Sequence, residues 1–183
     1  EVYKATPLTV CRDCEAVPAE ATPELSMEEI LAGSTAAQPS LPQAPRIMDA
    51  RVNFIIDSIL KDVITKGTGR GALVLKRSDI AGKTGTTNGP MDAWFSGYNP
   101  DIVTSTWVGF DNYTPLGRKE FGGTAALPIW IDFMREVLPK EQAITDMPSG
   151  VVRLRIDRKT GRRVTGTPEG STYEYFFEEF LPA

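Results

Sequence analysis

Three strand-like stretches lie close together in the middle of this sequence, and a helical stretch lies on each side of them. The stretches 80–87, 93–98 and 102–110 have the composition of β-strands. Asn99-Pro100-Asp101 is a turn signal between the second and the third, which predicts an antiparallel hairpin. Apolar residues recur at helical spacing over 49–66 and over 127–138. The chain must therefore combine helices with antiparallel strands.

The expected ends of the two helices follow from single residues. Asp49 is placed to cap the first helix, and Gly67 is placed to end it. Thr124 is placed to cap the second helix, Pro128 stands in its first turn, and Pro139 ends it. The apolar residues of the first helix are Val52, Ile55, Ile56, Ile59, Leu60 and Val63, and those of the second are Leu127, Trp130, Met134 and Leu138, with Ile131 and Phe133 beside them.

The absence of histidine excludes several kinds of active site. Every mechanism that needs an imidazole base is ruled out, including Ser-His-Asp and Cys-His sites. With two cysteines and no histidine, a four-ligand Cys/His zinc site is also ruled out, and we expect no metal and no cofactor. The net charge of −4 gives no basic field for nucleic acid or an anionic membrane. No apolar run of about 18 residues occurs that could span a membrane.

The composition divides the 183 residues into three regions. Residues 1–45 contain six of the 14 prolines and carry a net charge of −5, whereas the remainder sums to +1. We therefore expect a loop-rich segment over 1–45, a folded region over 46–148 and a C-terminal extension over 149–183. The sequence has no initiator methionine and no signal peptide, so we expect a mature fragment or an excised piece.

The C-terminal extension begins with an alternating pattern. Val152, Leu154 and Ile156 alternate with two arginines, which predicts a half-buried strand. Residues 157–161 are a turn signal, and 163–165 are expected to return as the second strand of a hairpin. Residues 173–180 mix aromatic and acidic side chains, and both a docked segment and a free tail fit that composition.

Cys11 and Cys14 form a Cys-x-x-Cys pattern in the first region. This spacing occurs in redox motifs, in halves of metal sites and in tight disulfides. A redox motif needs a strand before it and a helix after it, and a metal site needs a second half; the sequence indicates neither. A disulfide that staples a loop in an oxidising compartment is the preferred interpretation.

Residues 82–87, Gly-Lys-Thr-Gly-Thr-Thr, are the main candidate for chemistry. A phosphate-binding loop would need a glycine five residues before Gly82, and that position is Arg77. Residues 67–72 formally match a dinucleotide-binding pattern, but a helix precedes them and a strand-like stretch follows, which reverses the required context. Both nucleotide-binding interpretations therefore fail.

Lys83-Thr84-Gly85 is also the third motif of serine acyl-transferases of the penicillin-binding type. In that setting Lys83 supplies a fixed positive charge for a substrate carboxylate, and the hydroxyls of Thr84 and Thr86 donate to the same group. Gly85 lets a substrate backbone approach the strand, which can pair with an extended peptide. The backbone N–H of Thr86 can serve as an oxyanion donor. The expected catalytic residues are Lys83 and Thr86, and the expected substrate-binding residues are Thr84, Gly85, Thr86 and Thr87.

A series of motifs in one order resembles the C-terminal half of the transpeptidase domain of penicillin-binding proteins, most closely the class A, bifunctional members. The motifs are Gly67-Thr68-Gly69, residues 81–87, residues 92–98, residues 107–111, and Gly122-Gly123-Thr124 followed by residues 126–130. The resemblance covers residues 46–138. It implies an α/β (α+β) fold of the penicillin-binding protein and serine β-lactamase type, an antiparallel sheet flanked by helices, to which this chain contributes three adjacent strands and the last helix.

Two of the three motifs of that family are missing from their expected places. The family nucleophile lies in a Ser-x-x-Lys motif well before Lys-Thr-Gly, and the one formal match here, Ser58 to Lys61, is only 25 residues before Lys83. Ser58 and Lys61 also lie outside the apolar stripe of their helix, which is the position of ordinary polar residues on the surface of an amphipathic helix. No serine has an asparagine two positions later. We therefore expect the nucleophile to lie outside this chain.

The resemblance implies a peptidoglycan DD-transpeptidase that works by serine acyl transfer. Its partners would be D-Ala-D-Ala stem peptides, β-lactam antibiotics and the upstream part of the same protein, with no nucleic acid. Its place would be the periplasmic face of the bacterial inner membrane, with the anchor and a glycosyltransferase domain outside this chain. The alternatives are a non-catalytic peptidoglycan-binding or scaffold module of the same fold, and a serine β-lactamase or carboxypeptidase. Labelling by penicillin and the rate of deacylation distinguish them.

Overall fold

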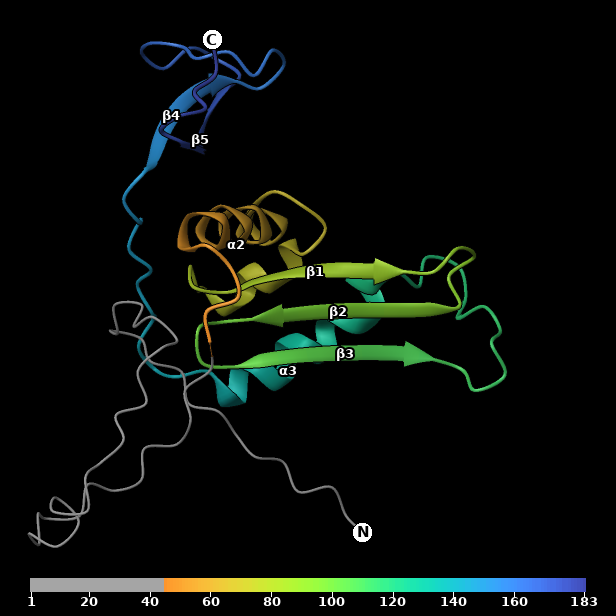
Figure 1. Cartoon of the computed structure of the whole chain (residues 1–183). Helices are drawn as coiled ribbons and strands as arrows, with labels where there is room; N and C mark the ends of the chain where they lie inside the picture. The colour runs from red at the N-terminus through yellow and green to blue at the C-terminus, as the bar shows by residue number, and fades with distance from the viewer. Residues whose placement is uncertain (1–44) are drawn as a thin grey trace, which may run out of the picture. The chain divides into compact units, whose positions relative to one another are not determined.

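The computed structural model describes residues 45–183, within which Ala50–Ala183 form one compact unit (Figure 1). Cys11 and Cys14 lie outside the described residues, so their disulfide stays a prediction. Among residues 45–183, no helix has the length and apolar character needed to cross a membrane.

The elements follow the predicted order. The unit begins with α2 (Ala50–Thr65) and a short 3₁₀ helix, η1 (Arg70–Leu75). Three strands follow: β1 (Ala81–Thr86), β2 (Asp92–Tyr98) and β3 (Val103–Gly109). A π-helical turn, η2 (Gly122–Ala126), leads into α3 (Leu127–Val137), and the chain ends with β4 (Val151–Asp157) and β5 (Ser171–Phe177). The helices and strands predicted between 49 and 138 are confirmed.

The first three strands form an antiparallel sheet in the order β1-β2-β3. The predicted turn between β2 and β3 is confirmed, because the Asn99 side-chain oxygen accepts the backbone N–H groups of Asp101 (3.2 Å) and Ile102 (2.8 Å). β1 is an edge strand, and no other strand in the described part of the chain pairs with its outer side. This outer side belongs to the strand that contains Lys-Thr-Gly.

The core lies between the sheet and α3, which runs behind the strands in Figure 1. Phe95 of β2 meets Trp130 of α3 edge to face, with ring centroids 4.9 Å apart. A Cβ at Gly97 would lie 2.6 Å from the Trp130 ring, so only glycine lets the helix pack this closely. Most of the predicted apolar face of this helix is confirmed, with Leu127, Trp130, Ile131 and Met134 buried, whereas Phe133, expected beside them, is 47% exposed.

The apolar pattern of α2 is only partly covered. Ile64 is its one buried residue, whereas Ile56 and Ile59 are 40% and 57% exposed. Both belong to the predicted apolar stripe, and their exposure shows that part of this face has no cover within residues 45–183.

Thr124 does not cap the last helix, contrary to the prediction. The chain enters α3 through the π-helical turn, so the residue before Leu127 is Ala126 and Thr124 lies inside η2. There its Oγ1 accepts the N–H of Phe121 at 2.8 Å and donates to the carbonyl of Lys119 at 2.7 Å. The threonine therefore fixes the turn before the helix.

The second strand of the C-terminal hairpin was also predicted wrongly. β4 pairs with β5 in an antiparallel register that joins Val151 to Phe177 and Asp157 to Ser171. The predicted partner, 163–165, contributes one isolated bridge, between Arg163 and Ile156. Five of the seven residues 171–177 are β-branched or aromatic, which favours a strand, and this acidic aromatic segment therefore pairs with β4.

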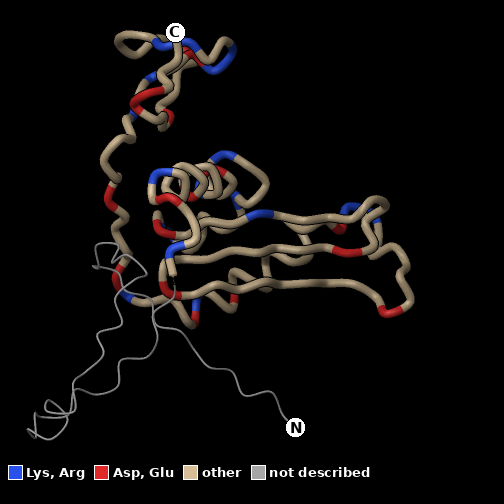
Figure 2. Tube along the Cα trace, in the orientation of Figure 1, with Lys and Arg blue, Asp and Glu red and all other residues tan. Residues whose placement is uncertain are grey.

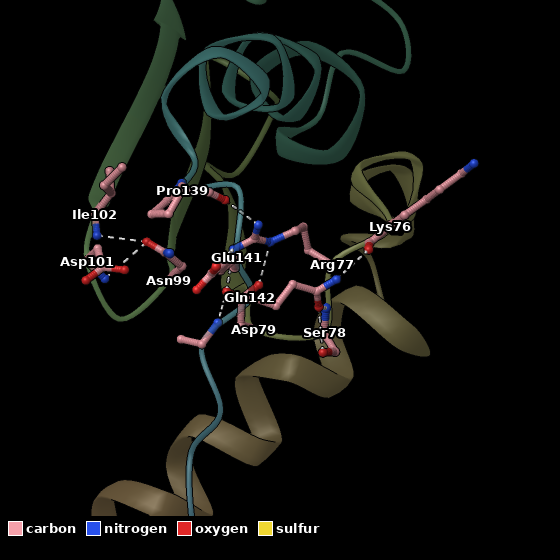
Figure 3. Close-up of polar contacts among 11 residues, drawn as sticks. Lys76, Arg77, Ser78, Asp79, Asn99, Asp101, Ile102, Pro139, Glu141 and Gln142 are labelled. Carbon is pink, nitrogen blue, oxygen red and sulfur yellow. Dashed lines mark hydrogen bonds and ion pairs between the residues drawn. The ribbon is translucent and has the colours of Figure 1, made fainter.

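The start of β1 is fixed by a buried ion pair (Figure 3). The Arg77 side chain donates to both carboxylate oxygens of Asp79, at 2.8 and 2.5 Å. Arg77 also donates to the carbonyl of Pro139, and Asp79 accepts the N–H of Ala143. The segment after α3 is thereby tied to the residues that lead into β1.

Candidate functional site

The predicted motif lies along β1. Lys83, Thr84, Gly85 and Thr86 are within the strand, and Thr87 is the first residue after it. Lys83 and Thr86 are exposed, while Thr84 and Gly85 are half-buried. The five predicted residues therefore lie in sequence along the edge strand of the sheet and the first residue of the turn after it.

The backbone of β1 offers hydrogen-bonding groups to its outer side. Thr87 N donates to Asp92 O at 3.2 Å, which marks a hydrogen-bonded pair of the β1–β2 ladder. Such pairs alternate along an antiparallel ladder, so Gly85 also bonds to its partner Trp94. The N–H and C=O of Thr84 and Thr86 then point away from β2. An extended ligand chain can pair with these two residues.

Lys83 is the charged group of this surface. β1, β2 and β3 together contain only two charged residues, Lys83 and Asp92, and the tube of Figure 2 shows how little charge the sheet has. Lys83 Nζ donates to the Thr84 carbonyl at 2.8 Å and lies 3.4 Å from Thr84 Oγ1. The ammonium therefore lies beside the outward-facing groups of Thr84.

The three threonine hydroxyls have different surroundings. Thr84 Oγ1 shares a hydrogen bond of 2.7 Å with Thr68 Oγ1. Thr86 Oγ1 accepts the Gly122 N–H at 3.1 Å and keeps its own proton for donation. Thr87 Oγ1 accepts two N–H groups of the following turn, those of Met91 at 3.2 Å and Asp92 at 2.9 Å. Thr86 thus retains a hydroxyl proton, Thr84 shares a hydrogen bond with Thr68, and Thr87 holds the turn.

Gly122 of η2 packs directly against the strand backbone. A Cβ at this position would lie 2.3 Å from the carbonyl oxygen of Trp94 and 2.5 Å from that of Gly85. Because neither backbone atom can move freely, only glycine fits. Gly122 and Thr68 belong to the motifs of the resemblance, but the sequence analysis gave neither a place beside Lys-Thr-Gly. The glycines on both sides of Thr68 were the one sequence signal that could have suggested it.

Asp92 braces the other end of the β1–β2 turn. Its carboxylate accepts Trp107 Nε1 at 2.9 Å, and its N–H donates to Thr87. The tryptophan of β3 is thereby tied to the turn that follows Lys-Thr-Gly. This arrangement supports the end of the β1–β2 hairpin.

Ser58 lies in a different place from the motif. It lines a cavity of about 510 Å³ with Phe54, Lys61 and Tyr175, and no residue from 81–87 lines that cavity. Lys61 forms an ion pair with Asp57 at 2.7 Å. This geometry agrees with the expectation that Ser58 and Lys61 are not the nucleophile and its base. Within residues 45–183, no group of three or more potential ligands could hold a metal ion.

The chain is similar to known penicillin-binding proteins in both sequence and structure. No family model matches the chain. The sequence is 57% identical to penicillin-binding protein 1A of Pseudomonas aeruginosa over 142 residues, which cover 76% of this chain and 17% of that protein. It is 51% identical to penicillin-binding protein 1A of Neisseria gonorrhoeae over 110 residues, 60% of this chain and 14% of that protein. The chain therefore spans less than a fifth of these relatives.

A solved structure also matches the fold. The crystal structure of penicillin-binding protein 1A from Haemophilus influenzae aligns with a TM-score of 0.70 and 36% identity, over 79% of this chain and 22% of that one. The predicted α+β fold is thereby confirmed, with its antiparallel sheet flanked by helices.

Proposed function

This chain belongs to the penicillin-binding protein 1A family and matches one part of its longer members, and we propose that it forms the Lys-Thr-Gly side of a peptidoglycan DD-transpeptidase site. The observation that carries this proposal is the position of the motif on β1, an edge strand whose outer side pairs with no other strand of residues 45–183. A substrate peptide needs such an open edge in order to pair with the protein backbone.

The substrate would be the D-Ala-D-Ala end of a peptidoglycan stem peptide. The extended peptide pairs with the outward-facing backbone groups of Thr84 and Thr86. Its terminal carboxylate meets the Lys83 charge and the hydroxyls of Thr84 and Thr86, because charge-assisted hydrogen bonds to a carboxylate are the strong ones. The Thr86 N–H then points toward the carbonyl oxygen that becomes an oxyanion.

The covalent steps require a serine outside these 183 residues. Its oxygen attacks the carbonyl carbon of the penultimate D-alanine while its proton passes to a base, and the terminal D-alanine leaves with a proton. An amine of a neighbouring stem peptide then attacks the ester, forms the cross-link and returns a proton to the serine. A β-lactam acylates the same serine.

The longer relatives support a wider proposal for the whole protein. The segment that precedes the matched part would carry Ser-x-x-Lys and Ser-x-Asn, a glycosyltransferase domain and a membrane anchor. The site would then lie on the periplasmic face of the inner membrane. A disulfide between Cys11 and Cys14 would be compatible with that oxidising compartment.

Penicillin labelling of the longer protein tests the proposal. Replacing Lys83 with alanine is expected to slow acylation by a labelled penicillin about 100-fold, because the fixed charge at the carboxylate and near the oxyanion is lost. Ser58→Ala is the matched control and should be labelled at the wild-type rate, since Ser58 lines a cavity that no residue of 81–87 lines.

Three results would contradict the proposal. Normal labelling kinetics in Lys83→Ala would remove the motif from the site. Loss of labelling in a folded Ser58→Ala protein would make Ser58 the nucleophile. No labelling of a folded wild-type protein would favour the alternative, a non-catalytic peptidoglycan-binding module.

A further inference from the structure

Thr68 lies beside the motif although it is 16 residues away in the sequence. It stands in the loop after α2, between two glycines that are anchored to that helix. Gly67 N donates to the Asp62 carbonyl at 3.0 Å, and Gly69 N donates to the Val63 carbonyl at 2.9 Å. The loop is thus fixed on both sides of Thr68, which places its hydroxyl 2.7 Å from Thr84 Oγ1.

The turn η2 supports the same contact from the opposite side. A Cβ at Gly123 would lie 3.0 Å from the Thr68 carbonyl and 3.8 Å from the Thr84 methyl group. The two threonines therefore meet where three elements converge: the loop after α2, the edge strand and η2. Thr68 is exposed and Thr84 half-buried, so the hydroxyl pair faces the surface on which a ligand would lie.

The direction of this hydrogen bond decides what Thr84 can do for an anion. Either hydroxyl can be the donor in the observed geometry. If Thr84 donates to Thr68, its single proton is used and its lone pairs face the ligand. If Thr68 donates to Thr84, the Thr84 proton stays available for a carboxylate oxygen. A bound carboxylate favours the second arrangement, in which two successive O–H groups polarise one another.

We propose that Thr68 is a positioning residue that donates its hydroxyl proton to Thr84 and so directs the Thr84 proton to the carboxylate of the substrate or β-lactam. This inference rests on the proposed function. Lys83 Nζ, 3.4 Å from Thr84 Oγ1, favours the same arrangement because its positive charge also draws the carboxylate to this place. Thr68 acts through Thr84 and does not touch the reacting atoms.

The test compares two ligands with three variants of the longer protein. The rate constant of acylation is measured with benzylpenicillin, which has a free carboxylate, and with its methyl ester, which has none. Thr68→Val keeps the shape and removes the hydroxyl, Thr68→Ala removes the hydroxyl with less bulk, and Thr68→Ser keeps the hydroxyl. We expect Val and Ala to slow acylation by benzylpenicillin about fivefold, the size of one net hydrogen bond. The ester should change less than about twofold, and Ser should restore the wild-type rate.

The outcomes separate this inference from the proposed function. Equal rates for wild type and Thr68→Val with benzylpenicillin would overturn the role of Thr68 alone. An equal loss with acid and ester would also overturn it, because a merely structural defect ignores the carboxylate. If Lys83→Ala is labelled normally, or wild type is not labelled at all, the proposed function fails and this inference fails with it.

Discussion

Asp79 is a carboxylate that the fold buries almost completely, with 2% of its surface exposed. Burial acts to raise its pKa, but hydrogen bonds from Arg77 and from the Ala143 N–H, together with the guanidinium charge, outweigh it and hold the pKa below 3.8. Figure 3 shows how these groups converge on one carboxylate. The ionised form of a single residue therefore connects the start of β1 to the segment after α3.

Acid should weaken this connection. Because the folded pKa lies below the unfolded value of 3.8, the unfolded chain binds more protons in this range. The stabilisation is complete above about pH 5 and is lost as the pH falls through the folded pKa. Asp79→Asn should lower the free energy of unfolding at pH 7 by about 3 kcal/mol and flatten its decline toward pH 3.

Urea unfolding at several pH values measures both effects. The control is Asp132→Asn, which breaks an exposed pair with Arg135 and should change the stability by less than about 0.5 kcal/mol. An Asp79→Asn chain with wild-type stability, or with an unchanged acid decline, would show that the carboxylate contributes little.

Single residues also show how far the sequence alone could reach. The position of Lys83, Thr84 and Gly85 on a strand was predictable because they lie together in one strand-like stretch. Thr68 was not assigned to the site, since its contact with Thr84 depends on the path of a loop 16 residues away. The role of Thr87 as holder of the turn also required the coordinates, because a threonine hydroxyl has the same sequence signature in both uses.

Among the elements, η2 tolerates little change at Gly122. Gly122→Ala would place a methyl group 2.3 Å from the Trp94 carbonyl and 2.5 Å from that of Gly85, so the turn must move away from the sheet. We expect a loss of about 2 kcal/mol in the free energy of unfolding. Penicillin labelling of the longer protein should also slow, because Thr86 loses its hydrogen bond from the Gly122 N–H.

Gly71→Ala is the matched control for Gly122. Its new Cβ would meet the end of the Leu127 side chain at 3.1 Å, and a small shift of that side-chain end relieves the contact, whereas the backbone carbonyls beside Gly122 cannot move in this way. Thermal unfolding and labelling rate should both stay near wild type in the control. If the two alanine variants behave alike, close packing of η2 on the strand is not what holds the site.

The sequence predicted an element correctly where residues next to it in the chain determine its structure. The β2–β3 hairpin was predictable because the Asn99 side chain forms the turn by accepting the nearby backbone N–H of Ile102. The pairing of β4 with β5 was missed because a turn signal after Asp157 pointed to the nearer segment. The strand formed instead from 171–177, whose aromatic side chains pack across the pair: Arg153 lies over the Tyr173 ring at 4.3 Å. Long-range packing outweighed the shorter loop.

At the scale of the whole molecule, the sheet with its helices has a core of its own. The buried cluster runs from Ile64 to Met134 and includes no residue of β4 or β5. The hairpin region meets α2 and the residue after it through these contacts: Phe54 edge to face with Tyr175, Arg51 over the Phe177 ring at 5.1 Å, and ion pairs of Arg51 with Glu179 at 2.8 Å and Lys66 with Glu174 at 3.8 Å. Contacts of these kinds are worth about 1 kcal/mol each. The boundary predicted between 148 and 149 therefore predicts that the sheet with its helices folds without the C-terminal hairpin.

Two shortened chains test that boundary. A chain that ends at Pro148 should lose no more than about 4 kcal/mol of unfolding free energy and keep the circular dichroism of the sheet. A chain that ends at Lys140 also removes the Ala143 N–H from Asp79 and the Gln142 oxygen from Ser78. It should lose at least about 3 kcal/mol more, because buried polar groups are left unpaired. Loss of the sheet's circular dichroism in the chain that ends at Pro148 would mean that the hairpin and the sheet fold as one cooperative unit, and the boundary would then have to be abandoned.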